Sequence, residues 1–369
     1  MAHRIVVLGA GYGGLTAAVR TGRLLRRQDV RVILVNRSDR FTERIRLHQL
    51  AAGQELSDRP LARMLTGTKV ELVVGTVVGL DPVARRVRVA DAPEPLGYDT
   101  LIYALGSGAD LDAVPGVREH AYSLAELNPA QRLRARLREL PGGAVAVVVG
   151  GGLTGIEAAA ELAEAYPQLT VEMVTAAPVG GWLSAHAQRH LRRSLQQLGV
   201  AVQDGRHIVK VVARELLFDD GCRRNADLII WAAGFRVPAL AANAGLAVDA
   251  VGRMIVDDRL RSVSHPDIYG VGDVAAAPTP GGTRTRMSCQ TAMQMAPYVA
   301  QEINRALHGR PSKPVAIRYI WQNISLGRHD GVTQFTHADD SPAGPALTGR
   351  GSARFKELIS RTALRQAQR

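Results

Sequence analysis

Cysteine is scarce in this chain of 369 residues. The two cysteines, Cys222 and Cys289, lie far apart and form no Cys-x-x-Cys pair. A disulfide framework, a zinc knuckle and a redox-active dithiol all depend on paired cysteines. The sequence therefore argues against all three, and we expect no metal centre.

Long apolar runs are also missing. No stretch reaches the roughly 20 apolar residues that a membrane-spanning helix needs, and the N-terminus leads into an apolar strand pattern rather than a signal peptide. We therefore expect a cytoplasmic protein. Near the C-terminus, Arg354 to Arg361 form a short basic amphipathic segment. Two alternatives stay open for it, a packed terminal helix or peripheral contact with the inner face of the plasma membrane.

Lysine and aromatic residues are few as well. Only four of the 46 basic residues are lysines, and aromatic residues make up 4% of the chain. The arginines are scattered along the predicted helices, whereas single-stranded nucleic acid is bound by basic segments interleaved with aromatics. The formal net charge of +12 favours anionic partners such as nucleotides, but we expect no nucleic acid partner.

What the chain does contain is a glycine turn between an apolar strand and an Ala-rich helix, in residues 147–162 (VVVGGGLTGIEAAAEL). In this context Gly-x-Gly-x-x-Gly is a dinucleotide-binding signal. Gly150 allows the tight turn, Gly152 lets the backbone approach a pyrophosphate, and Gly155 lets the helix pack closely on the strand. The helix N-terminus then faces the phosphates with its unpaired N–H groups.

The N-terminus repeats the same pattern in residues 5–15 (IVVLGAGYGGL), followed by a predicted helix over Leu15 to Arg27. Two such turns indicate two nucleotides. We therefore predict an α/β protein with two Rossmann-like dinucleotide-binding domains and a small C-terminal region. Strands that end in glycine near residues 106 and 234 mark the crossings between the domains. The first domain is expected to comprise 1–112 and 236–310, the second 113–235, and the C-terminal region 311–369.

Both turns lack the carboxylate that usually binds a ribose about 20 residues after the last glycine. Asn36 ends the second strand of the first domain, and Thr175 takes the matching place in the second. Asn36 can still bond a hydroxyl, so we predict adenosine-side contacts from Asn36 and the adjacent Arg37. In the second domain an arginine of the next helix can meet a 2′-phosphate instead, so NADH and NADPH both stay open: Arg189, Arg192 or Arg193.

Two further polar stretches adjoin the first domain. A strand pattern over residues 268–271 runs into Gly272 and Asp273, whose carboxylate can accept hydrogen bonds from polyol hydroxyls. A polar group after Phe41 can line the flavin or substrate opening, or can form a solvated helix face: Arg44, Arg46, His48 and Gln49.

Two Rossmann turns, two strands ending in Ala-Leu-Gly and Ala-Ala-Gly, and a late Gly-Asp resemble the two-dinucleotide-binding-domain flavoproteins of the FAD-dependent pyridine nucleotide-disulfide oxidoreductase superfamily. Within it the chain looks most like type II NADH dehydrogenases, the single-subunit NADH:quinone oxidoreductases. The resemblance covers roughly residues 1–305. Its most specific parts are residues 289–294 (CQTAMQ), close to the AQxAxQ quinone-site motif, and residues 150–157 (GGGLTGIE).

The resemblance implies hydride transfer from NAD(P)H to FAD, then two-electron reduction of a quinone-like acceptor. It implies that Glu157 lies near the nicotinamide and flavin, and that Gln290 and Gln294 lie at the quinone pocket. FAD is expected in the first domain, along Gly9, Gly11, Gly13, Gly14, Asn36, Arg37, Gly106 and Asp273. NAD(P)H is expected in the second, along Gly150, Gly152, Thr154, Gly155 and Gly234.

Other acceptors stay open, because the tail after Lys313 lacks a convincing membrane-anchoring helix. One alternative is a reductase of a ferredoxin-type protein, steered by the positive charge. A second is a specialised-metabolism flavoenzyme that acts on a small aromatic or quinonoid compound. From a different class comes a non-catalytic FAD/NAD redox sensor. A homodimer also stays open.

Overall fold

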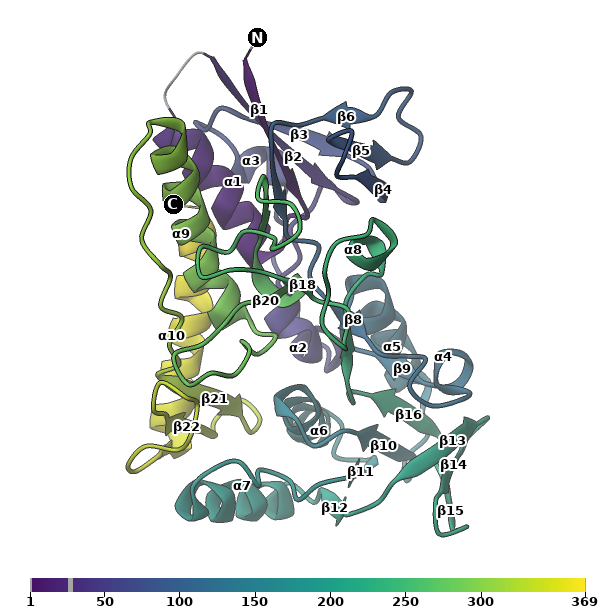
Figure 1. The fold of residues 1–369 in the computed structure, drawn as a ribbon. Helices are drawn as coiled ribbons and strands as arrows, with labels where there is room; N and C mark the ends of the chain where they lie inside the picture. Colours follow the sequence, from purple (N-terminus) through teal and green to yellow (C-terminus); the bar gives the residue numbers. More distant parts are fainter. Residues whose placement is uncertain (1, 26–28, 369) are drawn as a thin grey trace.

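Two five-stranded parallel sheets form the body of the molecule, one above the other in Figure 1. The computed structural model describes residues 2–25 and 29–368. The first sheet has the strand order β19-β7-β1-β2-β3, and the second has the order β12-β11-β10-β16-β9. The predicted α/β fold with two Rossmann-like sheets is confirmed.

The first sheet collects strands from distant parts of the chain. Its order places β19, from the late Gly-Asp region, beside β7. A separate antiparallel three-stranded sheet follows β3 in the chain, with the order β4-β5-β6. The bounds are β1 (His3–Leu8), β2 (Val30–Asn36), β3 (Val70–Val74), β4 (Val77–Asp81), β5 (Arg86–Val89), β6 (Leu96–Gly97), β7 (Thr100–Tyr103) and β19 (Ile268–Gly270).

Two long helices lie against one another beside the first sheet: α1 (Tyr12–Leu24) and α9 (Cys289–Leu307). Helix α1 begins three residues before the predicted Leu15, directly after the glycine turn, and of its predicted end Arg26 and Arg27 lie outside the described residues. Shorter elements complete this half: η1 (Arg44–Arg46), α2 (Leu47–Ala51), α3 (Leu61–Met64), β8 (Gly108–Ala109), β17 (Phe235–Arg236), α8 (Leu240–Asn243), β18 (Met254–Ile255), η2 (Gly272–Val274) and β20 (Ala275–Ala276).

The second sheet is built the same way. Its central strand β10 (Val145–Val149) runs into the second glycine turn and then into helix α6 (Leu153–Ala165). The other elements are α4 (Val117–His120), β9 (Tyr122–Ser123), α5 (Leu127–Glu139), β11 (Thr170–Thr175), α7 (Ala185–Gln197), β12 (Ala201–Asp204), β13 (Ile208–Val212), β14 (Glu215–Phe218), β15 (Arg223–Asn225) and β16 (Leu228–Trp231).

The C-terminal region forms a small sheet and one helix: β21 (Trp321–Ser325), β22 (Gly331–Phe335), β23 (Leu347–Thr348) and α10 (Gly349–Ala367). Helix α10 is longer than the predicted segment Arg354–Arg361, and it packs against α1, α9, β21 and β22. The packed terminal helix is therefore confirmed. Across residues 2–25 and 29–368, every helix is too short or too polar to span a bilayer.

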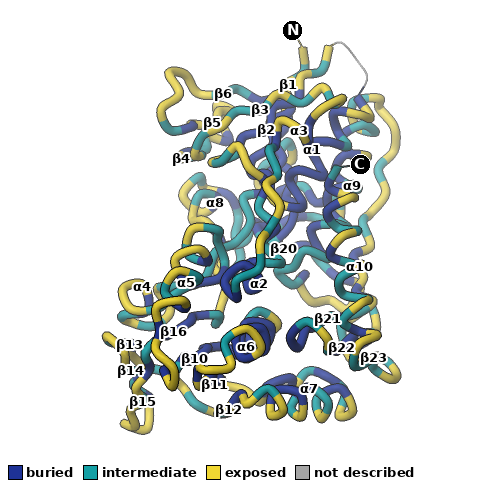
Figure 2. The backbone as a smooth tube through the Cα atoms, turned by 180° about the vertical axis from the view of Figure 1, so that it is seen from behind, coloured by how far each residue is buried: buried dark blue, intermediate teal, exposed yellow. Residues whose placement is uncertain are grey.

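Helices α2 and α6 lie where the two sheets meet, and they are among the most buried helices (Figure 2). Leu47 and Leu50 of α2 belong to the same apolar core as Ile156 of α6. Ile324 and Val332 of the C-terminal sheet join this core too. The C-terminal region is therefore packed into the junction between the two nucleotide-binding halves rather than attached at its surface.

Candidate functional site

The two glycine turns have the same steric construction. Gly9 and Gly150 have φ values of +94° and +118°, which disfavour any residue with a side chain. A Cβ atom on Gly14 would lie 1.9 Å from the carbonyl oxygen of Gly9, and a Cβ on Gly155 would lie 1.9 Å from that of Gly150. Helix and strand can therefore approach this closely only at glycine.

The middle glycine of each turn faces open space. A Cβ atom on Gly11 or Gly152 would have no neighbour within 4 Å, and each residue caps the N-terminus of a 13-residue helix. Backbone N–H groups at a long helix N-terminus with free space before them suit a pyrophosphate. The residues present therefore fit a dinucleotide at each turn.

The remaining glycines of the predicted cofactor set have different surroundings. Gly13 packs against the α9 side, where an added Cβ would lie 2.8 Å from Val271 and 3.2 Å from Ala292. Its counterpart Thr154 in the second turn is half-buried. Gly106 and Gly234 have φ values of +70° and +79° and lie just after strands β7 and β16. Strand β7 lies beside β1, which leads into the first glycine turn, and β16 lies beside β10, which leads into the second.

Asn36 supports the first turn from the neighbouring strand. Its Oδ1 accepts a hydrogen bond from the backbone N–H of Ala10 (2.9 Å), and its Nδ2 donates to the carbonyl oxygen of Ser38 (2.8 Å). The oxygen and the nitrogen of the side-chain amide are thus both bonded to backbone, which orients Asn36 at the edge of the turn. Arg37 points to solvent and forms an exposed ion pair with Glu126 at 3.0 Å.

Thr175 takes the equivalent place beside the second turn, since an added Cβ on Gly151 would lie 3.1 Å from the Cβ of Thr175. Thr175 is buried, and its hydroxyl donates to Asp204 (3.1 Å). Arg192 is ion-paired with the same carboxylate. Burial raises the pKa of Asp204, but the bonds from Arg192, from the N–H of Val179 and from Thr175 outweigh it and hold this pKa below its usual value. Of the three predicted arginines, Arg192 is thus the one that contacts the group beside the second turn, through its ion pair with Asp204.

A polar group joins the ends of both sheets near the first turn. Ser107, after β7, donates a hydrogen bond to Asp273 at 2.7 Å, and Asp273 is ion-paired with Arg44 at 3.6 Å. Arg44 also donates to the carbonyl oxygen of Ser107 (2.6 Å) and lies over the ring of Phe235 (5.4 Å). The predicted polyol-binding Asp273 therefore lies where β7, β19 and the segment after β16 meet.

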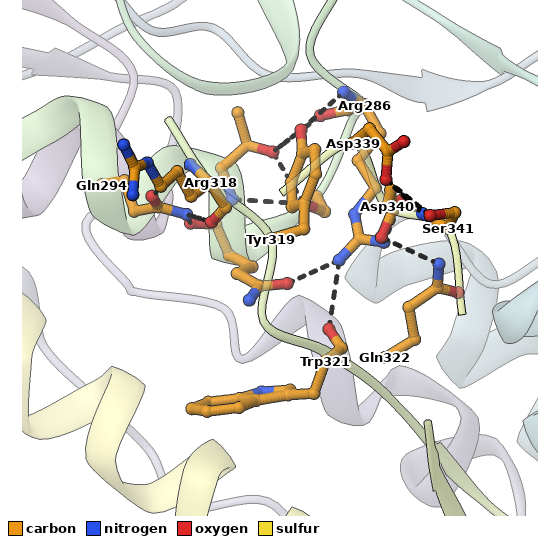
Figure 3. A network of polar contacts seen from close by, with 12 residues as sticks. Arg286, Gln294, Arg318, Tyr319, Trp321, Gln322, Asp339, Asp340 and Ser341 are labelled. Atoms are coloured by element: carbon orange, nitrogen blue, oxygen red, sulfur yellow. Dashed lines mark hydrogen bonds and ion pairs between the residues drawn. The ribbon is translucent and has the colours of Figure 1, made fainter. Parts of the chain in front are cut away.

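Gln290 and Gln294 lie at the start of α9. Gln294 is bonded to Arg318 of the C-terminal region (Figure 3), whereas Gln290 is linked to that region through Arg286. Gln294 accepts from the N–H of Arg318 (3.1 Å) and donates to its carbonyl oxygen (3.0 Å). Gln290 accepts from the guanidinium of Arg286 (2.5 Å), which is ion-paired with Asp340 (2.6 Å). The two predicted glutamines therefore lie close together, with their amides oriented by Arg286 and the backbone of Arg318.

Glu157 lies at a different place, in a buried polar cluster between α6, α2 and α10. Its carboxylate is ion-paired with Lys356 and accepts a hydrogen bond from the N–H of Ser325 at 3.1 Å. Nδ1 of His48 lies 3.8 Å from the other carboxylate oxygen. Ser325 ends strand β21, whose first residue, Trp321, accepts a weak hydrogen bond from Arg286. At about 3.3 Å per residue, some 13 Å of β-strand separates Glu157 from the Gln290 network.

Burial controls the charge of this cluster. It lowers the pKa of Lys356 to about 7, helped by the nearby Arg46 and opposed by Glu357. Burial and the cations around it, first among them Lys356, also lower the pKa of His48 well below its usual range, so the imidazole is neutral. Within the described part of the chain, Nε2 of His48 is buried without a hydrogen-bond partner. The cluster thus combines a buried carboxylate, an ammonium that titrates near neutrality and an unsatisfied imidazole nitrogen.

Sequence reasoning did not single out Lys356 as a site residue. The available signal was its rarity, since it is one of only four lysines in an arginine-rich chain. Arginine stays charged at every relevant pH, whereas a buried lysine can lose its proton. The residues of the predicted polar group after Phe41 lie at two different places. His48 lies beside Glu157, whereas Arg44 is ion-paired with Asp273.

The cysteines remain apart in the structure. Cys222 is exposed and Cys289 is half-buried at the start of α9, and neither is bonded to the other. Burial, assisted by Asp273, raises the pKa of Cys289 to about 12. Cys289 is therefore a neutral thiol at physiological pH, and thiolate chemistry at this place is disfavoured.

Comparison with known proteins agrees with this arrangement. Residues 3–296 match the pyridine nucleotide-disulphide oxidoreductase family. An NADH dehydrogenase-like protein of Mycobacterium tuberculosis is 31% identical over 379 residues, covering 96% of this chain and 94% of that protein. A type II NADH:quinone oxidoreductase of Staphylococcus haemolyticus is 27% identical over 391 residues, covering 98% and 95%.

Among solved structures, the fold resembles NDH2 of Plasmodium falciparum in complex with NADH, with a TM-score of 0.84 and 18% identity. That likeness covers 100% of this chain and 96% of the other. The resemblance stated from the sequence is thereby confirmed. The chain belongs to the pyridine nucleotide-disulphide oxidoreductase family, as an NADH dehydrogenase-like enzyme that uses FAD as its cofactor and NAD(P)H as its co-substrate.

Proposed function

We propose that this enzyme oxidises NAD(P)H and reduces a quinone-like acceptor by two electrons. Residues 1–112 and 236–310 would hold FAD, and residues 113–235 would hold NAD(P)H. When bound, FAD accepts a hydride from NAD(P)H and supplies two electrons to the acceptor. The protein contributes binding, orientation and a proton source.

The two glycine turns support the binding part of this proposal. Gly11 and Gly152 leave the backbone open for a pyrophosphate at the two helix N-termini. Asp273, held by Ser107 and Arg44 at the end of the first sheet, is suited to accept hydrogen bonds from polyol hydroxyls. Helix α6, which begins at the second turn, packs against α2 of the first half.

The observation that carries the choice of acceptor is the Glu157–Lys356 pair at this junction. Quinone reduction takes up two protons together with two electrons, and NAD(P)H brings only one of them. A buried lysine with a pKa of about 7 can hold the second proton, and Glu157 orients its ammonium. Reduction of a ferredoxin instead releases the proton of the hydride, so that reaction needs no proton donor.

The glutamines at the start of α9 would keep one wall of the acceptor site in place. Gln294 bonds to the backbone of Arg318, and Gln290 bonds to Arg286, which donates to the carbonyl oxygen of Trp321. Both therefore hold the start of strand β21, whose last residue, Ser325, bonds to Glu157. The name of the Staphylococcus haemolyticus relative, a type II NADH:quinone oxidoreductase, supports the same acceptor class.

The test is an anaerobic stopped-flow experiment on the flavin-loaded protein. NADH or NADPH is expected to bleach the flavin absorbance, and menadione is expected to restore it rapidly. Gln290→Ala should slow only the second step, whereas Gln301→Ala, at an exposed position of the same helix, should slow neither. Rapid reoxidation by a ferredoxin with menadione inert would overturn the proposal.

A further inference from the structure

A cavity of about 780 Å³ opens beside the Glu157–Lys356 pair. It lies between the start of α2, the turn after β21 and one face of α10. We call it the cationic pocket, because six positively charged side chains line it: Arg46, Arg328, Arg350, Arg354, Lys356 and Arg361.

Carboxylates in and beside the lining pair with four of these six cations. Glu357 is shared between Arg46 (2.9 Å) and Arg361 (2.7 Å). Glu161 pairs with Arg328 (3.0 Å), and Glu157 pairs with Lys356. Arg350 and Arg354 have no ion pair or hydrogen bond to a side chain within the described ranges 2–25 and 29–368, and both are exposed at the rim. The pocket therefore keeps an excess of positive charge, which low-dielectric walls concentrate inside it.

The inner end of the pocket reaches the proposed catalytic cluster. Lys356 and Ser325 line the pocket and both bond to Glu157. The Lys356 side chain is only 15% exposed and lies at the inner end of the pocket. Arg350 and Arg354 are exposed and lie at its outer rim.

The size and chemistry of the lining limit what can enter. A volume of 780 Å³ lies within the range of about 300–1,000 Å³ that holds small organic ligands. Ala353 and Leu358 contribute aliphatic side chains to the lining, and His329 contributes an imidazole ring. A carboxylate or sulfonate that enters would meet the exposed guanidinium groups of Arg350 and Arg354 at the rim.

We propose that the cationic pocket admits a negatively charged quinonoid acceptor, a small ring that carries an acidic substituent. This inference rests on the proposed function and specifies its acceptor. In the net reaction NAD(P)H gives two electrons and one proton, and Lys356, reprotonated from solvent, gives the second proton. The acceptor becomes the corresponding hydroquinone, and its acidic substituent keeps its charge.

The experiment compares two acceptors in steady-state turnover of the FAD-loaded enzyme at low ionic strength. One is the anionic 9,10-anthraquinone-2-sulfonate, and the other is neutral menadione. In the double variant Arg350→Glu/Arg354→Glu, the ratio of kcat/KM for the sulfonate to that for menadione should fall at least about 10-fold. The double lysine variant keeps the charge and should keep most of the ratio.

Two controls separate the possible failures. Arg132→Glu makes the same charge change at an exposed position of α5 and should leave the ratio unchanged. The preference of the natural chain for the sulfonate should fade at high salt, because screening shortens the reach of the rim charges. An unchanged ratio in the glutamate variant overturns the pocket assignment, whereas failure of the natural enzyme to reduce either quinone overturns the proposed function.

Discussion

The two glycine turns are alike in backbone and different in side chains. In each turn, a Cβ atom added to the last glycine would lie 1.9 Å from the carbonyl oxygen of the first, Gly9 or Gly150. Two positions after the last glycine, however, the first helix carries Thr16 and the second carries Glu157. Thr16 donates to the carbonyl oxygen of Tyr12 within its own helix, whereas Glu157 pairs with Lys356 from another region.

This difference shows which part of a nucleotide-binding unit is shared and which part is specialised. Pyrophosphate binding uses backbone N–H groups, so the glycine spacing is the same in both halves. The proposed reaction uses side chains at the junction, where α6 presents the carboxylate of Glu157 and α1 has Thr16 at the matching position. Substitutions that make one turn resemble the other, or that block one turn alone, can test this division.

The largest effects are expected from closing one turn at a time. Gly14→Ala places a methyl group against the Gly9 carbonyl and should cost about 3 kcal/mol or more, with loss of FAD. Gly155→Ala makes the same clash in the second half, so the protein should keep FAD but lose reduction by NAD(P)H. Urea unfolding and flavin absorbance measure both effects. Gly142→Ala, where an added Cβ meets nothing within 4 Å, should leave both properties intact. Loss of FAD from the Gly155→Ala variant, with FAD kept by the Gly14→Ala variant, would contradict the assignment of the two turns.

The next largest effect is expected at Glu157. A lysine with a pKa of about 7 carries its proton below that pH, so menadione turnover should be highest below pH 7 and fall as the pH rises through 7. Glu157→Gln removes the anion that stabilises the ammonium, so the fall should move to lower pH. Turnover at pH 7.5 should drop roughly 100-fold.

Turnover measured from pH 5.5 to 9 checks this prediction. Lys356→Met should abolish the inflection near pH 7. Thr16→Val, at the equivalent place of the first helix, should leave the position of the inflection unchanged. An inflection that survives in Lys356→Met would show that another group supplies the proton.

A smaller, selective effect is expected at the ribose ends of the turns. Thr175 offers no carboxylate to a ribose hydroxyl, and Asp204 beside it is already bonded to Arg192, so the natural enzyme should use NADPH at least as well as NADH. Thr175→Asp should raise the ratio of kcat/KM for NADH to that for NADPH by about 10-fold, because a carboxylate accepts from the 2′-hydroxyl and repels a 2′-phosphate. Asn36→Asp makes the matching change at the first turn and should leave this ratio unchanged. A strong NADH preference of the natural chain would contradict this account.

The smallest effect is expected at Arg37. Its side chain is 64% exposed and pairs with the exposed Glu126, and such surface pairs contribute about 0–1 kcal/mol. Arg37→Ala should therefore weaken FAD binding less than about threefold. Equilibrium titration of the apoprotein with FAD measures this change, and a 10-fold loss would mean that Arg37 binds the cofactor directly.

Much of the fold followed from local sequence pattern. The strand, glycine turn and helix pattern of residues 5–15 and 147–162 predicted both Rossmann halves, because each motif needs only neighbouring residues. The length of α10 and its packing on α1, α9, β21 and β22 did not follow, since they depend on partners distant in the chain. The apolar positions of that helix are too few to identify its buried face from sequence.

The candidate site divides in the same way. The sequence alone determined the two nucleotide turns, and by resemblance it indicated Glu157, Gln290 and Gln294, because these residues lie within short motifs. Only the tertiary structure showed that Glu157 meets Lys356 across almost 200 residues of chain, that Asp340 holds the arginine bonded to Gln290, and that a cationic pocket opens beside the pair. Such contacts leave no local pattern, because burial and charge pairing arise only once distant segments pack together.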